Sequence, residues 1–106
     1  MKTDRELLEL AAKAAGYKGF WDEAWKEYLI PDNKGDSRFW RPLADNGDTL
    51  RLAIKLCMDL NIDSGHTHVG IGKVSVLEDN ESNGSAEAAT RRAVTRAAAA
   101  VGEAMP

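Results

Sequence analysis

The chain has 106 residues, of which 43% are hydrophobic and 29% are charged, and its formal net charge is -3 at pH 7. This length fits one globular domain with a modest core, so we expect residues 1–106 to form a single domain. The weakly acidic balance gives no general attraction to nucleic acid or acidic membranes, and no apolar run approaches the roughly 20 residues of a membrane span.

The first residues predict an amphipathic helix over residues 4–15. Thr3 and Glu6 have the spacing of a capping box, in which each side chain bonds to the backbone N–H of the other residue. Leucine and alanine then recur at helical spacing up to Gly16, which can take the left-handed conformation that ends many helices. The acidic stretch MKTDRELLEL is unlike a signal peptide, so we expect a cytoplasmic protein.

Residues 17–40 contain all seven aromatic residues of the chain. Part of this segment follows a helical period that Pro31 would end, whereas residues 18–22 and 26–30 can equally pair as a hairpin. The pattern leaves both structures open. Residues 31–37 are rich in turn-forming residues and predict an exposed loop.

The aromatic cluster has two interpretations. Large rings can fill the space between alanine-rich helices, or some of them can form an exposed surface for a partner. We favour the first interpretation because the chain has few other bulky side chains. If the cluster binds another protein, we expect Trp21, Trp25 and Trp40 to make the contact.

Residues 46–60 predict the central helix of the fold. Pro42 disfavours helical dihedrals in the residue before it, and Asp45 or Asn46 can then cap a new helix. Asp48 follows in the first turn, where a negative charge complements the helix dipole. Apolar side chains cover well over half of the helical wheel, so we expect the other elements to enclose this helix.

Cys57 lies on the apolar face of this predicted helix. It is the only cysteine, so the chain cannot form an internal disulfide. We expect a small buried side chain rather than a reactive thiol, because the neighbouring residues in the sequence supply no base.

Residues 60–62 and 67–77 are rich in β-branched side chains and predict an antiparallel hairpin around a turn at 63–66. The apolar positions change parity at Gly72, so we expect the strand to break or bulge there. Residues 78–84 predict a polar linker.

His66 and His68 are the best candidates for metal ligands, because side chains two residues apart on a strand point to the same side. A zinc site needs a third protein ligand, and Asp63 is the nearest one in the sequence. No second cluster of ligands accompanies them. We therefore favour two solvent-exposed histidines and predict no metal site.

The last segment predicts a helix from a cap at Ser85 to about Gly102, with an apolar stripe of alanine and valine. The basic cluster on it consists of Arg91, Arg92 and Arg96, and these side chains could follow a phosphate backbone. A solvated helix face is the favoured interpretation, because three charges are few and nearby acidic residues compensate them.

The chain resembles a family of small uncharacterised proteins encoded by tailed bacteriophages and prophages, in the blocks RELLELAAKAAG, WRPLADNGDTLRLAIKL and AATRRAVTRAAAAVGEAMP. The blocks cover roughly half of the chain in the same order, and the segments between them match poorly. The family usually has asparagine at the position of Arg41 and aspartate at the position of Asn46, and neither difference alters the helix start. The resemblance implies an accessory protein of the bacterial host cytoplasm that binds a host or phage component. It supplies no activity, cofactor or catalytic residue.

Together these features predict an α+β domain with three main helices packed on a small antiparallel sheet. We expect a protein that acts by protein–protein contact, with self-association favoured by the aromatic segment. Nucleic-acid binding through Arg91, Arg92 and Arg96 is the alternative. The sequence assigns no catalytic residue and no cofactor, and we expect no enzymatic activity.

Overall fold

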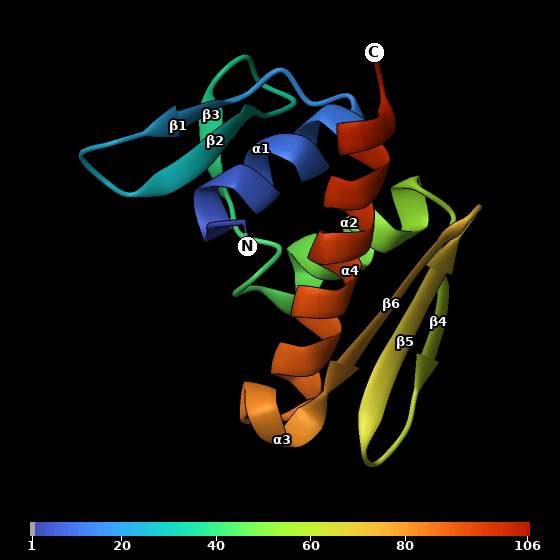
Figure 1. Ribbon diagram of the computed structural model, residues 1–106. Coiled ribbons are helices and arrows are strands. Elements are labelled where there is room, and N and C mark those ends of the chain that lie inside the picture. Colours follow the sequence, from blue (N-terminus) through green and yellow to red (C-terminus); the bar gives the residue numbers. More distant parts are fainter. Residues whose placement is uncertain (1) are drawn as a thin grey trace.

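The computed structural model describes residues 2–106, which form helices and antiparallel sheets (Figure 1). Within these residues there are four helices and two sheets of three strands each. In chain order the elements are α1 (Asp4–Ala15), β1 (Phe20–Asp22), β2 (Glu27–Pro31), β3 (Ser37–Trp40), α2 (Asn46–Lys55), β4 (Asp59–Ile62), β5 (His66–Ile71), β6 (Val74–Asp79), α3 (Asn80–Asn83) and α4 (Ala86–Ala104). The α+β class is confirmed, although a short fourth helix and a second sheet add to the arrangement that the sequence predicts.

Helix α1 begins and ends where the sequence predicts. The Thr3 hydroxyl accepts a hydrogen bond from the Glu6 N–H at 3.2 Å, and the Thr3 N–H donates to the Glu6 carboxylate at 3.0 Å. Gly16 ends the helix with a φ of 76°, a conformation that costs little for a residue without a Cβ. The buried side of α1 consists of Leu7, Leu8, Ala11, Ala12 and Ala15.

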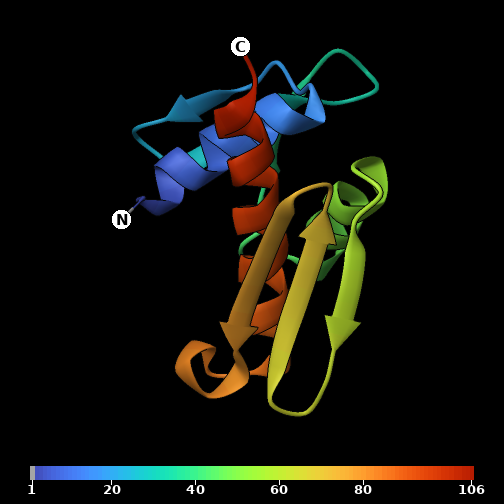
Figure 2. The ribbon, with the colours of Figure 1, turned by 45° about the vertical axis from the view of Figure 1, so that its right-hand side comes forward.

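Helix α4 forms the centre of the molecule, with α1 and the sheet β4–β6 packed against different sides of it (Figure 1, Figure 2). Eight of its nineteen residues are buried, and most of these are alanine. Small residues let neighbouring backbones approach closely: a Cβ on Gly102 would lie 2.0 Å from the Leu10 carbonyl oxygen. No helix described within residues 2–106, α4 included, is long and apolar enough to cross a membrane.

Strands β1, β2 and β3 form an antiparallel sheet beside α1 (Figure 1). The segment 18–30 is therefore a hairpin rather than a helix, and β3 is an additional strand beyond those predicted from the sequence. Tyr28 pairs with Trp21 on one side and with Trp40 on the other. The buried Trp40 ring meets Tyr17 and Tyr28 edge to face, at centroid distances of 5.4 and 5.9 Å. This side of the aromatic segment fills the core.

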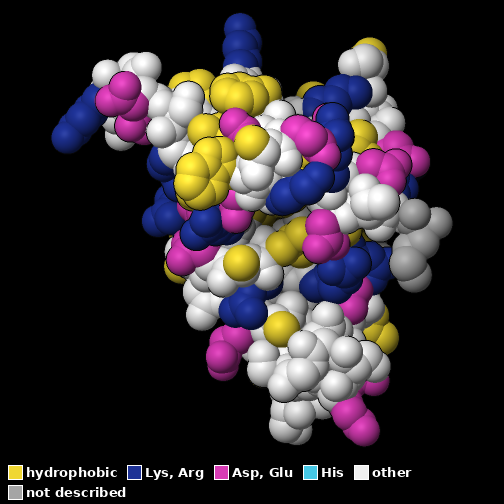
Figure 3. All heavy atoms as spheres, turned by 90° about the vertical axis from the view of Figure 1, so that its left-hand side faces the viewer, with side chains coloured by type: hydrophobic (Ala, Val, Ile, Leu, Met, Phe, Trp, Pro, Cys, Tyr) yellow, Lys and Arg dark blue, Asp and Glu magenta, His cyan; other side chains and the backbone are white. Residues whose placement is uncertain are grey.

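The opposite face of this sheet carries the exposed aromatic rings. Phe20, Leu29 and Phe39 lie side by side in the strand register, on the face turned away from Trp40. The Trp25 ring lies 6.0 Å from the Phe39 ring, between centroids. Figure 3 shows hydrophobic side chains on this side of the molecule, interrupted by Lys, Arg, Asp and Glu side chains. We call this surface the aromatic face.

The prediction of a central, enclosed helix over residues 46–60 is wrong. Helix α2 ends at Lys55, and only four of its ten residues are buried. Leu50 and Ile54 are 54% and 65% exposed. The alanine-rich α4 occupies the centre instead, because its small side chains permit close packing on several sides.

Cys57 is exposed, so the expectation of a buried side chain is wrong. The helix has already ended at this point, and Cys57 lies in a turn with a φ of 54° that leads the chain into β4. The helical period that placed Cys57 on an apolar face does not extend beyond residue 55.

Strands β4, β5 and β6 form the second antiparallel sheet, which lies along α4 (Figure 2). Val69 and Val76 are buried on the face toward this helix. The break expected at Gly72 is a turn with a φ of 57°, and β5 and β6 pair on either side of it. The predicted linker 78–84 is wrong in part, because β6 continues to Asp79 and α3 follows it directly.

Candidate functional site

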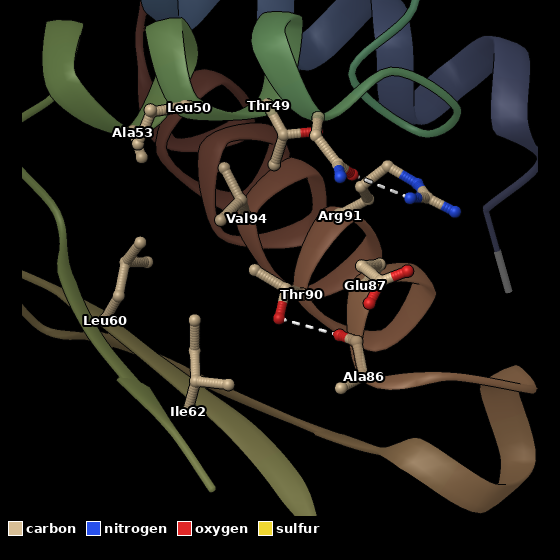
Figure 4. A pocket seen from close by; sticks show the side chains of 11 residues that line it. Thr49, Leu50, Ala53, Leu60, Ile62, Ala86, Glu87, Thr90, Arg91 and Val94 are labelled. Atoms are coloured by element: carbon tan, nitrogen blue, oxygen red, sulfur yellow. Dashed lines mark hydrogen bonds between the residues drawn. The ribbon is translucent and has the colours of Figure 1, made fainter.

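An apolar groove opens between α2, β4 and α4 (Figure 4). Its volume is about 290 Å³. Helix α2 contributes Leu50 and Ala53, β4 contributes Leu60 and Ile62, and α4 contributes Val94 and small residues near its start. Figure 4 shows the Leu60 and Ile62 side chains pointing from the strand toward the two helices. We call this site the α2–β4–α4 groove.

The groove exists because β4 extends beyond the helix that covers the rest of its sheet. Leu60 pairs with Val69, and Ile62 pairs with Thr67, so all four side chains lie on the same face. Val69 and Thr67 are fully buried, whereas Leu60 and Ile62 are 37% and 53% exposed. Two aliphatic side chains on the core-facing side of the sheet therefore remain open to solvent.

Most polar groups of the groove bond within the chain. Arg91 Nε donates to the Leu43 carbonyl oxygen at 3.1 Å, and Arg91 Nη1 donates to Asn46 Oδ1 at 2.7 Å. The Thr90 hydroxyl donates to the Ala86 carbonyl oxygen at 2.8 Å. Dashed lines in Figure 4 mark the Arg91 bond to the asparagine and the Thr90 bond. These groups do not need a ligand to satisfy them.

Glu87 is different, because it lines the groove, is exposed and forms no ion pair with another residue in the range 2–106. It lies in the first turn of α4, where a carboxylate complements the helix dipole. Asp59, at the start of β4, is a second exposed acid without an ion pair among the described residues, but its side chain lies on the face of the strand opposite to Leu60 and outside the groove. The lining of the groove is thus mainly apolar, and its two charged residues, Glu87 and Arg91, have opposite signs, an arrangement suited to binding apolar side chains.

The groove was not predicted from the sequence, because the apolar pattern places Leu50 and Leu60 on one enclosed helix. The signal that could have revealed it is the alternation over residues 59–62, where acid, leucine, asparagine and isoleucine follow one another. Such alternation is typical of a strand with one apolar face.

The structure separates the three tryptophans predicted to contact a partner. Trp40 is 1% exposed, which contradicts its assignment as a contact residue. Trp21 is half-buried; its Nε1 donates to Glu23 Oε2 at 2.9 Å, and the Arg5 guanidinium lies 5.6 Å from its ring. Trp25 is 70% exposed, in the turn between β1 and β2. Of the three, Trp25 alone offers most of its ring to a partner.

The three arginines of α4 also fail to form one surface. Arg91 is turned toward α2 and bonded there. Arg92 Nη1 lies 3.4 Å from Asp4 Oδ1, and Arg96 forms an ion pair with Glu78. Arg92 and Arg96 line a second cleft of about 830 Å³ between α1, α4 and β6. Each guanidinium therefore has a partner within the chain.

The two histidines lie on the outer face of the sheet β4–β6 and have separate partners. His66 Nε2 lies 3.3 Å from Asp63 Oδ2, and His68 Nε2 lies 2.6 Å from the Ser75 hydroxyl oxygen. Across residues 2–106, no three His, Cys, Asp or Glu side chains gather as a metal site would require.

Asp48 is a buried carboxylate at the start of α2. Asp45 caps the helix, as the sequence predicts, by accepting a hydrogen bond from the Asp48 N–H at 2.8 Å. The Asp48 carboxylate accepts from Arg51 at 2.8 Å and from Arg38 at 3.0 Å. It also accepts from the Arg41 N–H at 2.9 Å. Burial alone would raise the pKa of Asp48, but the bonds from these three donors outweigh burial, so the pKa is lowered.

Comparison with known proteins yields no relative for this chain. No protein-family model, no curated protein and no solved structure matches it. The resemblance to phage and prophage proteins therefore stays a prediction.

Proposed function

We propose that this protein acts by binding another protein through the α2–β4–α4 groove, as an accessory protein of a phage or prophage. The observation that carries the proposal is the exposure of Leu60 and Ile62 on the core-facing side of their sheet. Leu50 and Ile54 extend the exposed apolar surface along α2. Covering such surface removes apolar area from water, which favours association. Apolar anchors in a concave site are typical of protein-binding hot spots.

The phage or prophage origin rests on the three blocks of sequence resemblance. It implies a partner from the phage or the host, in the cytoplasm of a bacterial cell. Self-association is the other form that binding through the groove can take. We assign no catalytic residue, no cofactor and no enzymatic activity to the protein.

Capture of partners from infected bacterial lysate tests the proposal with two matched variants. Ile62→Lys places a charge in the groove, whereas Leu77→Lys places the same charge on the opposite face of the same sheet, at a side chain that is 60% exposed. We expect wild type and Leu77→Lys to capture the same protein. Because a charge in a desolvated hot spot is costly, Ile62→Lys should reduce the captured amount by about tenfold or more. Circular dichroism checks that both variants are folded.

Trp25→Ala serves as the control for the aromatic face, since Trp25 is the exposed tryptophan there. Equal capture by the two lysine variants would contradict binding through the groove. Loss of capture in Trp25→Ala, with full capture by Ile62→Lys, would instead assign the interaction to the aromatic face.

Nucleic-acid binding through Arg91, Arg92 and Arg96 is the second candidate function. It is favoured by Lys73, which lines the second cleft together with two of these arginines, while Lys2 in the same lining is paired with Glu103. It is weakened by the partners that all three guanidinium groups have within the chain. This candidate predicts affinity for DNA or RNA that falls steeply with added salt and is lost on Arg92→Ala with Arg96→Ala, whereas protein binding predicts little salt dependence.

A further inference from the structure

Strand β4, whose Leu60 and Ile62 line the groove, is also the free edge of the sheet β4–β6. Strand β4 pairs only with β5 and forms the outer edge of the sheet in Figure 2. The Asp63 N–H donates to the His66 carbonyl oxygen at 3.0 Å. Residues that bond across an antiparallel pair alternate along the strand. The backbone groups of Asn61 therefore also face β5, and those of Leu60 and Ile62 point outward.

This edge is open to another strand. The backbone groups of Leu60 and Ile62 bond to no further segment within the part of the chain that the structure describes. A strand that pairs with them would place every second side chain on the face that their own side chains occupy. That face is the floor of the groove. The edge and the groove therefore form one continuous site.

We propose that the ligand of this site is an extended segment of the partner protein, which adds to β4 as a fourth strand and inserts apolar side chains at alternate positions into the groove. This inference rests on the function proposed above and specifies how the partner binds. In strand addition, backbone bonds supply affinity and pockets for alternate side chains supply specificity. A volume of about 290 Å³ holds a few side chains, and the open edge of β4 favours an extended segment as their source.

The charge around the site selects a basic segment from a different protein. Glu87 and Asp59 are exposed and form no ion pair with any residue in the range 2–106. Arg91, the cation of the groove lining, bonds to the neutral oxygens of Leu43 and Asn46, so its charge still offsets that of Glu87. The charge of Asp59, on the opposite face of β4 beside an added strand, is left uncompensated. Lysine or arginine beside the apolar residues of the segment would complement the remaining negative charge. A second copy of this chain would bring the same acids to the interface, and opposed like charges destabilise a strand pair.

Selection from a library of short random peptides tests this sequence preference. The wild-type protein is the bait, and peptides that also bind Ile62→Lys are removed. We expect the enriched peptides to carry apolar residues at alternate positions, next to lysine or arginine. Three results would overturn the proposal: apolar residues at helical spacing, enrichment of acidic residues, or no enrichment over the variant.

N-methylation of the most enriched peptide tests the backbone pairing. Two versions are made, methylated on alternate sets of residues, because only every second N–H of an added strand faces β4. One set should weaken binding by about tenfold or more, and the other should change it by less than about threefold. Equal effects of the two sets would exclude strand addition, while loss of peptide binding in Ile62→Lys would still support the groove as the binding site.

Amide hydrogen exchange locates the pairing on the protein. With the unmethylated peptide bound, we expect slower exchange at Leu60 and Ile62 and little change at Asn61, whose N–H already faces β5. Unchanged exchange at Leu60 and Ile62 would overturn the proposal.

Sedimentation of the protein alone tests whether a second copy of the chain occupies the site instead. A dimer that Ile62→Lys abolishes would identify a second copy in the groove and contradict the choice of a different protein.

Discussion

At the scale of single residues, the Asp48 carboxylate fixes the start of the helix that lines the groove. It is 4% exposed, and a buried carboxylate is stable only when hydrogen bonds replace its hydration. Arg51 donates to it from within α2, and Arg38 donates from β3. These bonds connect α2 to the sheet β1–β3. One side chain therefore positions a wall of the groove relative to the rest of the molecule.

The lowered pKa of Asp48 predicts a loss of stability in acid. Its contribution to stability is complete above the pKa of the unfolded chain, about 3.9, and is lost as the pH falls through the lower pKa of the folded protein. Asp48→Asn should cost about 2 kcal/mol at neutral pH and reduce the acid dependence below about pH 4. Urea unfolding at several pH values measures both effects.

Asp45→Asn is the control for this prediction. Asp45 is exposed and asparagine caps helices as well as aspartate does, so stability and its pH dependence should change little. The role assigned to Asp48 is wrong if the two variants lose stability to acid in the same way as wild type.

At the scale of elements, the close contact of α1 with α4 depends on Gly102. A Cβ at this position would lie 2.0 Å from the Leu10 carbonyl oxygen, which is backbone and cannot turn aside. Gly102→Ala should therefore separate the two helices and lower the free energy of unfolding by about 2 kcal/mol. Gly47→Ala is the control, because the atoms nearest to its added Cβ are the ends of the Arg51 and Asp45 side chains, at 3.1 Å, and not backbone. Thermal or urea unfolding should show Gly47→Ala near wild type or slightly more stable, since alanine favours helix. Equal destabilisation by both substitutions would contradict the packing argument.

The helix starts could be predicted because capping depends on neighbours in the sequence. Thr3, Asp45 and Ser85 each accept a backbone N–H at the predicted place. Strand β3 could not be predicted in the same way, because four residues carry little pattern and the strand is defined by its pairing with β2. The change of parity at Gly72 predicted a break or bulge in one strand, whereas the structure has a hairpin turn there that separates β5 from β6. The local pattern locates the irregular position, but the pairing of the two halves depends on contacts between them.

At the scale of the whole molecule, the enclosed helix could not be identified from hydrophobicity alone. Helix α2 carries the larger aliphatic side chains, yet Leu50 and Ile54 face outward, while the alanines of α4 are buried. Which face is covered depends on contacts between distant segments, and these are absent from any local pattern. The groove was missed for the same reason: Leu60 resembles a core residue until its neighbours in space are known.

Leu52 and Ile54 allow a test of this arrangement, because they lie on the same helix and face opposite environments. Leu52 is fully buried, so Leu52→Ala should cost about 2–5 kcal/mol of unfolding free energy through lost contacts and a cavity. Ile54 is 65% exposed, so Ile54→Ala should cost less than about 1 kcal/mol. Urea unfolding of dilute protein measures both values. Similar losses would mean that the outward side of α2 is already covered in the free protein, for instance by a second copy, and the apolar surface beside the groove would no longer be available to a different partner.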